Sequence, residues 1–251
     1  MQLCDTQLGM GGYAADQSRF EIAVESINAL KADWVVICGD LVNDGNNDQA
    51  VADFQAIARG FEMPCHLAPG NHDVGNEPTL ESLKRYRDQY GPDYYAVREG
   101  GVKLMIVNTQ LWKAPVAGES EAHDRWFREE LAESQASGAP TLLVSHYPPF
   151  TDNPGEDENY YNLPPATRAE VLELAKGAGV KAWLAGHVHK NLERDFEGIP
   201  VIASATTSKN FDGAPYGFRV WTLGGDGALS HRYVALEIPE GRIPDEPAAA
   251  E

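Results

Sequence analysis

Cysteine is scarce in this sequence, and its distribution argues against a disulfide framework. The three residues Cys4, Cys38 and Cys65 are an odd number and show no C-x-x-C spacing. Two of them end apolar runs that are typical of strands. We interpret all three as small buried thiols in a reducing compartment, and we therefore expect a cytoplasmic protein.

Positive charge is also in short supply. Lys and Arg number 20 against 38 Asp and Glu, which gives a net charge of −18, and no run of basic residues occurs. Such a surface repels polyanions, so an unaided nucleic-acid partner is excluded. An anionic substrate would be steered poorly by the overall field, so local cations would have to attract it.

Long apolar segments are missing as well. No stretch approaches the roughly 18 residues that a membrane span requires, and no signal peptide is visible. We expect no membrane partner. Residues 1–4 already form the end of an apolar strand, so a leader in the natural precursor stays an open alternative.

Short apolar, β-branched runs recur along the chain and predict strands. Near-continuous hydrophobicity over about five residues indicates strands that are buried on both faces, as in a helix-covered sheet. The runs lie at residues 34–38, 65–67, 103–107, 141–145 and 181–185.

Amphipathic segments separate these runs and predict helices at 16–31, 123–136 and 165–176. Apolar residues such as Phe20 and Val24 recur at helical spacing in the first of them. Alternation of strands and helices predicts a largely parallel sheet.

The sequence pattern changes after about residue 190, where short predicted strands follow one another. We expect these strands to pack as a second sheet of one domain covering residues 1–236. An acidic tail at 237–251, rich in Pro and Ala, is predicted to be flexible. The expected strands lie at 191–196, 199–204, 217–223 and 229–235.

Polar side chains follow directly after five of the predicted strands. In an open α/β sheet, ligands gather outside the carboxyl ends of the strands, so we expect these side chains at one rim. They comprise two carboxylates, two carboxamides and four imidazoles: Asp5, Gln7, Asp40, Asn71, His72, His146, His187 and His189.

These residue types fit transition metals. Mixed oxygen and imidazole ligands without thiolate favour Mn, Fe or Zn over Mg or Ca. Gly39, Gly70 and Gly186 let the chain turn sharply beside the ligands. A single Asp after a strand is usually a turn or cap residue, but the ordered set GDLVN, GNHD, His146 and GHVH is a strong joint pattern. His66, His123 and His231 lack this context and are assigned surface or core positions.

These motifs resemble the calcineurin-like metallophosphoesterase superfamily, whose pattern is D-x-H, GD, GNH[DE], H and GHxH. The resemblance spans about residues 1–235 and is closest to one branch, whose animal members are serine/threonine phosphoprotein phosphatases. It implies an α/β fold, a four-layer α/β/β/α sandwich with two mixed β-sheets flanked by helices. It also implies two divalent or trivalent metal ions.

Carried over position by position, the resemblance divides the site residues between two metals. Asp40 would bridge both metals. Asp5 and His189 would hold the first metal, with Gln7 where most of the superfamily has histidine. The second metal would be held by Asn71, His146 and His187, and His72 would point toward the leaving-group oxygen as the general acid.

Two positions depart from the superfamily pattern. The carboxamide of Gln7 is a weaker ligand than imidazole, so we expect the first metal to bind less tightly. Asn43 replaces the aspartate that orients the GNH histidine in phosphoprotein phosphatases, and Asp44 or Asp73 could compensate.

The resulting hypothesis is a metal-dependent phosphatase that hydrolyses phosphomonoesters, of the serine/threonine protein type, with a phosphorylated substrate that could be a protein. His72 and Asp40 would be its catalytic residues. One rival is a phosphodiesterase for cyclic nucleotides or related diesters, and another is a weakly active metal-binding scaffold. Five aromatic residues either wall a substrate pocket or pack in the core: Tyr94, Tyr95, Trp112, Tyr160 and Tyr161.

Overall fold

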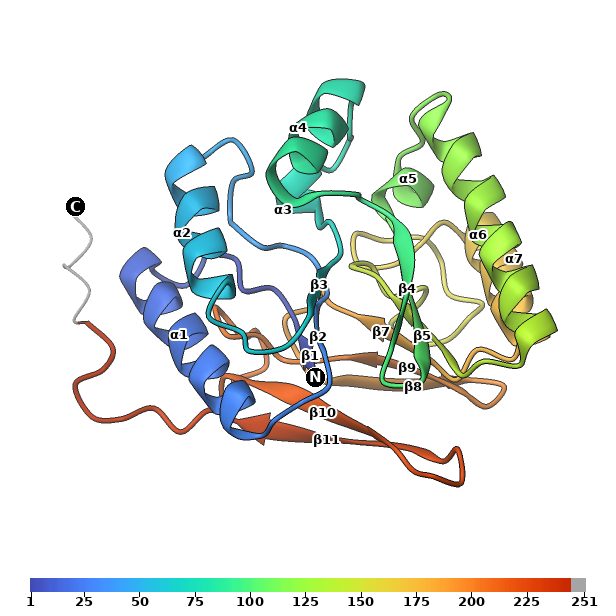
Figure 1. Ribbon diagram of the computed structural model, residues 1–251. Helices are drawn as coiled ribbons and strands as arrows, with labels where there is room; N and C mark the ends of the chain where they lie inside the picture. The colour runs from blue at the N-terminus through green and yellow to red at the C-terminus, as the bar shows by residue number, and fades with distance from the viewer. Residues whose placement is uncertain (245–251) are drawn as a thin grey trace.

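The computed structural model of the protein describes residues 1–244, in which strands and helices alternate along much of the chain (Figure 1). The strands are β1 (Gln2–Leu3), β2 (Val35–Ile37), β3 (Cys65–Leu67), β4 (Tyr95–Glu99), β5 (Val102–Ile106), β6 (Thr141–Val144), β7 (Ala182–Ala185), β8 (Leu192–Phe196), β9 (Ile199–Ala203), β10 (Gly217–Leu223) and β11 (Leu229–Ala235). The helices are α1 (Tyr13–Ala29), α2 (Asp48–Ala58), α3 (Asn71–Val74), α4 (Leu80–Tyr90), α5 (Gln110–Lys113), α6 (Glu119–Ser137) and α7 (Pro165–Gly177).

These strands form two mixed sheets. One sheet has the order β11-β10-β1-β2-β3 and the other has the order β4-β5-β6-β7-β9-β8. Strands β1, β2 and β3 run parallel to one another, as do β5, β6, β7 and β9. Each sheet therefore has an edge at which the carboxyl ends of its central strands meet.

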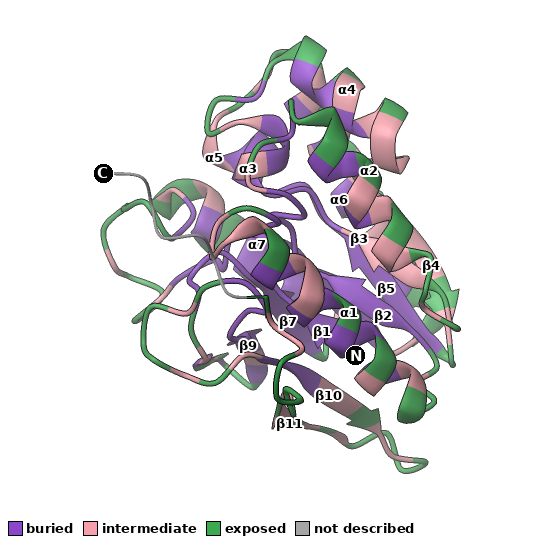
Figure 2. Ribbon diagram, turned by 90° about the vertical axis from the view of Figure 1, so that its left-hand side faces the viewer, coloured by how far each residue is buried: buried purple, intermediate pink, exposed green. Residues whose placement is uncertain are grey.

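Side-chain alternation along the strands produces four layers. On β2, Val36 lies in a core between the two sheets, whereas Ile37 packs in the core under α1 and α2. On β7, Leu184 lies between the sheets, whereas Trp183 packs under α6 and α7. Because successive strand residues point to opposite faces, each apolar run covers two cores at once. Figure 2 shows these strands buried and the outer faces of the helices exposed.

The predicted strands and the three predicted helices are present, with ends that differ by a few residues. The expectation that the last four strands pack as a second sheet is wrong. Strands β8 and β9 extend the sheet of β7, whereas β10 and β11 extend the sheet of β1. Each hairpin pairs with an open edge of a different parallel sheet, because unpaired edge groups need partners. Helices α2, α3, α4 and α5 and strand β4 were not predicted.

The C-terminal tail lies partly outside the described residues, which end at residue 244. In the described part, Arg242 donates a hydrogen bond of 2.7 Å to Glu25 on α1. The flexibility of 237–251 and the single domain over 1–236 stay predictions. Within residues 1–244, no helix combines the length and apolar character needed to cross a membrane.

A buried glutamine joins the two sheets beside the strand ends. Gln2 on β1 donates through Nε2 to the carbonyl oxygens of Ala185 and Ile202, both at 3.0 Å. Its Oε1 accepts a hydrogen bond of 2.8 Å from Trp221 Nε1. Every polar atom of this side chain is therefore satisfied in the core between the sheets.

We predict that Gln2→Leu lowers the free energy of unfolding by about 2–3 kcal/mol, because it leaves two strand carbonyls and one indole N–H without this partner. Urea unfolding measures the change. The control is Gln49→Leu, whose exposed side chain bonds Asp53 on the same helix, and its effect should stay within about 0.5 kcal/mol. Equal stabilities of the two variants would contradict this role of Gln2.

Candidate metal centre

All eight polar residues predicted at strand ends lie at the carboxyl ends of strands. Three of the five strand ends belong to one sheet and two to the other. The site therefore spans the junction of two sheets, whereas the sequence pattern alone predicted one rim. Asp5 and Gln7 follow β1, Asp40 follows β2, Asn71 and His72 begin α3 after β3, His146 follows β6, and His187 and His189 follow β7.

The backbone at these strand ends has an unusual conformation. Seven non-glycine residues in the described chain have positive φ, and five of them are site residues. Their φ values are 48° at Asp5, 35° at Gln7, 50° at Asp40, 69° at His187 and 51° at His189. Left-handed backbone is unfavourable for residues with a Cβ and persists where the surroundings impose it. Its concentration here indicates a functional site.

Two glycines allow the strand ends to approach closely. A Cβ on Gly70 would lie 2.1 Å from the backbone nitrogen and Oδ1 of Asp40. On Gly186 it would lie 2.5 Å from the carbonyl oxygen of Cys38 and 2.9 Å from Asp5 Oδ2. Only glycine fits at these two positions, so these turns bring the polar side chains together.

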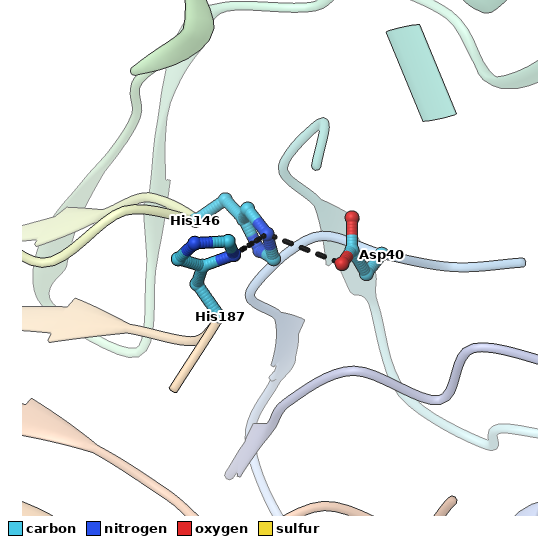
Figure 3. A group of neighbouring side chains, drawn as sticks. All are labelled: Asp40, His146 and His187. Carbon is cyan, nitrogen blue, oxygen red and sulfur yellow. Dashed lines mark hydrogen bonds and ion pairs between the residues drawn. The ribbon is translucent and has the colours of Figure 1, made fainter. Parts of the chain in front are cut away.

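Two groups of donors share one carboxylate. Asp40, His146 and His187 form one group, and Asp5, Asp40 and His189 form the other, with the donor atoms of each group within 4.8 Å of one another. Figure 3 shows His146 between His187 and Asp40. Its Nε2 lies 3.3 Å from Asp40 Oδ2 and 3.1 Å from His187 Nδ1. Two cation sites with a common Asp40 fit this arrangement.

Asn71 adds an oxygen to the group of Asp40, His146 and His187. Its Oδ1 lies 3.0 Å from His146 Nε2. Its Nδ2 donates to the hydroxyl oxygen of Tyr160 at 3.3 Å. The carboxamide is thereby turned so that its oxygen, the atom that can bind a cation, faces the other donors.

Each site imidazole is anchored to a backbone carbonyl through one ring nitrogen. A carbonyl can only accept, so each contact places a proton on that nitrogen and leaves the other ring nitrogen free. The distances are 2.8 Å from His72 Nδ1 to Asn43 O, 2.8 Å from His146 Nδ1 to Cys38 O, 3.1 Å from His187 Nε2 to Tyr160 O and 2.6 Å from His189 Nδ1 to Lys209 O.

Burial and mutual contact set the charges of the site. Burial favours the neutral form of Asp40. The positive charge of His146 and the hydrogen bond from His146 outweigh this effect and hold the Asp40 pKa well below its usual range. Burial lowers the pKa of His146, but Asp40 outweighs this effect and raises it to about 9. Burial holds the pKa of His187 well below its usual value, and burial raises the pKa of Asp5 to about 6.

The two departures from the superfamily pattern contact each other. Gln7 Nε2 donates to Asn43 Oδ1 at 3.3 Å. This leaves Gln7 Oε1 buried and without a hydrogen-bond partner. A buried carbonyl oxygen without a donor is costly unless a cation or water satisfies it. The Gln7 oxygen, two residues after Asp5 in the sequence, therefore fits a metal ligand.

Neither acidic residue considered as a substitute for the missing aspartate bonds the His72 ring in the described chain. The carbonyl oxygen of Asn43 accepts from that ring instead. Asp73 bonds the backbone: its carboxylate accepts from the N–H groups of Leu41 at 3.0 Å and Gly70 at 2.7 Å. Asp73 thus joins the loops that carry Asp40 and His72.

The remaining histidines lie outside the centre. His66 Nε2 is 3.5 Å from Glu99, and His231 Nδ1 is 2.8 Å from Arg219 Nη1. His123 is fully buried between aromatic rings, with centroids at 4.9 Å from Trp112 and 5.0 Å from Tyr94.

Of the five aromatic residues, two lie at the site. Tyr94 and Trp112 surround His123, and the hydroxyl of Tyr95 accepts from the backbone N–H of Leu67 at 3.2 Å. Tyr160 and Tyr161 are exposed, and their rings contact the His187 ring. Sequence reasoning did not identify the carbonyl partners of the imidazoles, because a backbone carbonyl has no side-chain signal.

Comparisons with known proteins support the family resemblance that the sequence motifs indicate. Residues 2–191 match the family described as calcineurin-like phosphoesterase. Serine/threonine-protein phosphatase CPPED1 of Bos taurus is 32% identical over 240 residues, which cover 90% of this chain and 76% of that protein. The 3′,5′-cyclic adenosine monophosphate phosphodiesterase CpdA of Escherichia coli strain K12 is 27% identical over 222 residues, which cover 79% of this chain and 72% of that enzyme.

A solved structure supports the fold. The crystal structure of a dimetal phosphatase from Danio rerio superposes with a TM-score of 0.65 at 16% sequence identity and covers 94% of this chain and 98% of that chain. The predicted α/β fold class with two mixed sheets flanked by helices is confirmed.

We predict that metal binding at neutral pH releases about one proton from His146. Its pKa of about 9 keeps the ring protonated in the metal-free protein, and a metal ligand must be unprotonated. Affinity should therefore rise with pH until about pH 9 and then level off. Calorimetric titration with Mn²⁺ in two buffers of different ionisation enthalpy measures the proton count. Equal heats in both buffers would contradict the assignment.

Proposed function

This chain belongs to the calcineurin-like phosphoesterase family and is thus a hydrolase, and from this premise we propose that it hydrolyses phosphomonoesters as a metal-dependent phosphatase of the serine/threonine protein type. The observation that carries the proposal is the pair of donor groups that share Asp40, with His72 beside them. Similarity to the named serine/threonine-protein phosphatases supports the substrate class.

We assign the metal ligands as follows. Asp40 would contribute its carboxylate to both metal ions, because it is the member common to both donor groups. The first ion would be held by Asp5, Gln7 and His189, and the orphaned oxygen of Gln7 supports this assignment. The second ion would be held by Asn71, His146 and His187.

The donor set favours Mn, Fe or Zn, because it mixes imidazole with oxygen and lacks thiolate. When bound, the two ions supply positive charge for the phosphoryl oxygens and lower the pKa of water, so that hydroxide is available at neutral pH. The neutral carboxamide of Gln7 makes the first site the weaker one.

His72 is proposed to protonate the leaving-group oxygen. Its Nδ1 donates to Asn43 O at 2.8 Å, so the ring would act as imidazolium and donate its second proton from Nε2. Its backbone N–H donates to Asp40 Oδ1 at 2.9 Å, so the ring is positioned by the bridging carboxylate. His72 belongs to neither donor group, and this supports the role of an acid.

A phosphodiesterase that acts on cyclic nucleotides or related diesters is the second candidate, favoured by the similarity to the E. coli enzyme. A weakly active metal-binding scaffold is the third, and the weak ligand Gln7 is the feature that favours it. The proposed substrate is a phosphorylated protein.

We predict that the protein with added Mn²⁺ hydrolyses 4-nitrophenyl phosphate faster than bis(4-nitrophenyl) phosphate. Both esters release the same chromophore, so absorbance compares them directly. A preference for the diester would contradict the proposed function in favour of the phosphodiesterase. Absence of turnover for both esters, at full metal content, would favour the scaffold.

We predict that His72→Ala lowers kcat by about 100- to 10,000-fold and leaves the metal content unchanged. The loss should be larger for a phosphoserine peptide than for 4-nitrophenyl phosphate, because nitrophenolate leaves without a proton. Steady-state kinetics and elemental analysis measure both effects. The control is His66→Ala, which removes an imidazole outside the site. If His72→Ala lost its metals, His72 would be a ligand and the assignment would fail.

A further inference from the structure

Exposed aromatic side chains gather at the metal centre. Six large apolar side chains are exposed in the described residues, and three of them are aromatic. These are Tyr160, Tyr161 and Phe211, at 51%, 40% and 52% exposure. Single exposed apolar residues are common, but a cluster beside a reactive centre marks a binding surface.

All three rings lie against histidines that we assign to the metals, and the Tyr160 centroid lies 4.8 Å from that of His187. Phe211 stacks on His189 with a centroid distance of 4.6 Å and an interplanar angle of 11°. The Tyr161 centroid lies 5.6 Å from that of His187. A group that contacts these rings is therefore next to the place where the phosphate would bind.

A cleft of about 310 Å³ lies along this part of the chain. This volume is at the small end of the range for ligand pockets, about 300–1,000 Å³, and suits one side chain better than a whole ligand. The cleft is lined by Thr151, Tyr161, Val188, Lys190, Phe211 and Asp212.

Hydrogen bonds within each loop hold the walls of the cleft in place. In the loop of Tyr161, the Glu156 carboxylate accepts from the backbone N–H groups of Thr151 and Asp152 at 2.8 and 2.7 Å. In the loop of Phe211, Asn210 accepts from the N–H of Thr206 at 2.7 Å. A preformed cleft binds with a smaller loss of conformational entropy.

The polar groups of the lining are mostly engaged within their own loops. The Thr151 hydroxyl donates to Glu156 at 3.2 Å, and Asp212 Oδ1 accepts from the N–H of Ala214 at 2.9 Å. Lys190 is exposed and can lay its aliphatic stem along the cleft. Tyr161, Val188 and Phe211 supply the apolar part of the lining, and this part favours an apolar side chain over a nucleobase.

We propose that this cleft binds an apolar, preferably aromatic, side chain next to the phosphorylated residue of a peptide substrate. The inference rests on the proposed function and specifies its substrate class. An extended peptide advances about 3.3 Å per residue. A residue one or two positions from the phosphoserine would therefore reach the cleft while the phosphate lies at the metal centre.

The test compares phosphoserine peptides that differ only in one neighbouring residue, Phe or Ala, at each position from two before to two after the phosphoserine. At one position we expect kcat/KM to be about tenfold higher with Phe, since burial of part of an aromatic ring contributes this much. Tyr161→Ala and Phe211→Ala should bring the ratio close to one, and Phe211→Leu should keep part of it.

The ratio within each variant cancels any change in metal content, because both peptides meet the same enzyme. Leu30→Ala removes an exposed apolar side chain at the end of α1 and should leave the ratio unchanged. Equal rates for Phe and Ala at every position, or a preference that persists in both alanine variants, would overturn the proposal. If no phosphopeptide were hydrolysed while cyclic nucleotides were, the proposed function would fail with it.

Discussion

The hydrogen bonds from four imidazoles to backbone carbonyls are the interaction on which this site depends. Each one fixes a ring orientation and leaves the other ring nitrogen free. The acceptors lie on three loops, with Cys38 and Asn43 both in the loop after β2, so they hold the imidazoles only if those loops keep their places. The layered core and the buried Gln2 keep the loops in place, because they fix the two sheets against each other at their carboxyl ends.

The cost of assembling the centre is visible in its backbone. Five site residues have left-handed φ values, and two glycines allow contacts that no other residue fits. Burial of carboxylates and imidazoles also costs free energy unless their opposite charges pair. In the metal-free protein the protonated His146 pairs with the ionised Asp40, and a cation would replace that proton.

Much of the site could be predicted from the sequence, because Asp40, His146 and His187 follow apolar runs and glycine marks two of the sharp turns. The carbonyl partners could not be predicted, since every residue has a carbonyl and only the fold selects Cys38 or Lys209. The sharing of the last strands between both sheets was missed for a similar reason. Pairing of β10 with β1 joins distant segments, and neither segment alone encodes its partner.

We propose that the centre holds two metal ions unequally and that both share Asp40. Anomalous diffraction from a crystal soaked in Mn²⁺ tests it most directly, because each metal appears as its own peak. We expect two peaks on either side of the Asp40 carboxylate, with lower occupancy beside Asp5, Gln7 and His189. A single peak, or two peaks without a common contact to Asp40, would contradict it.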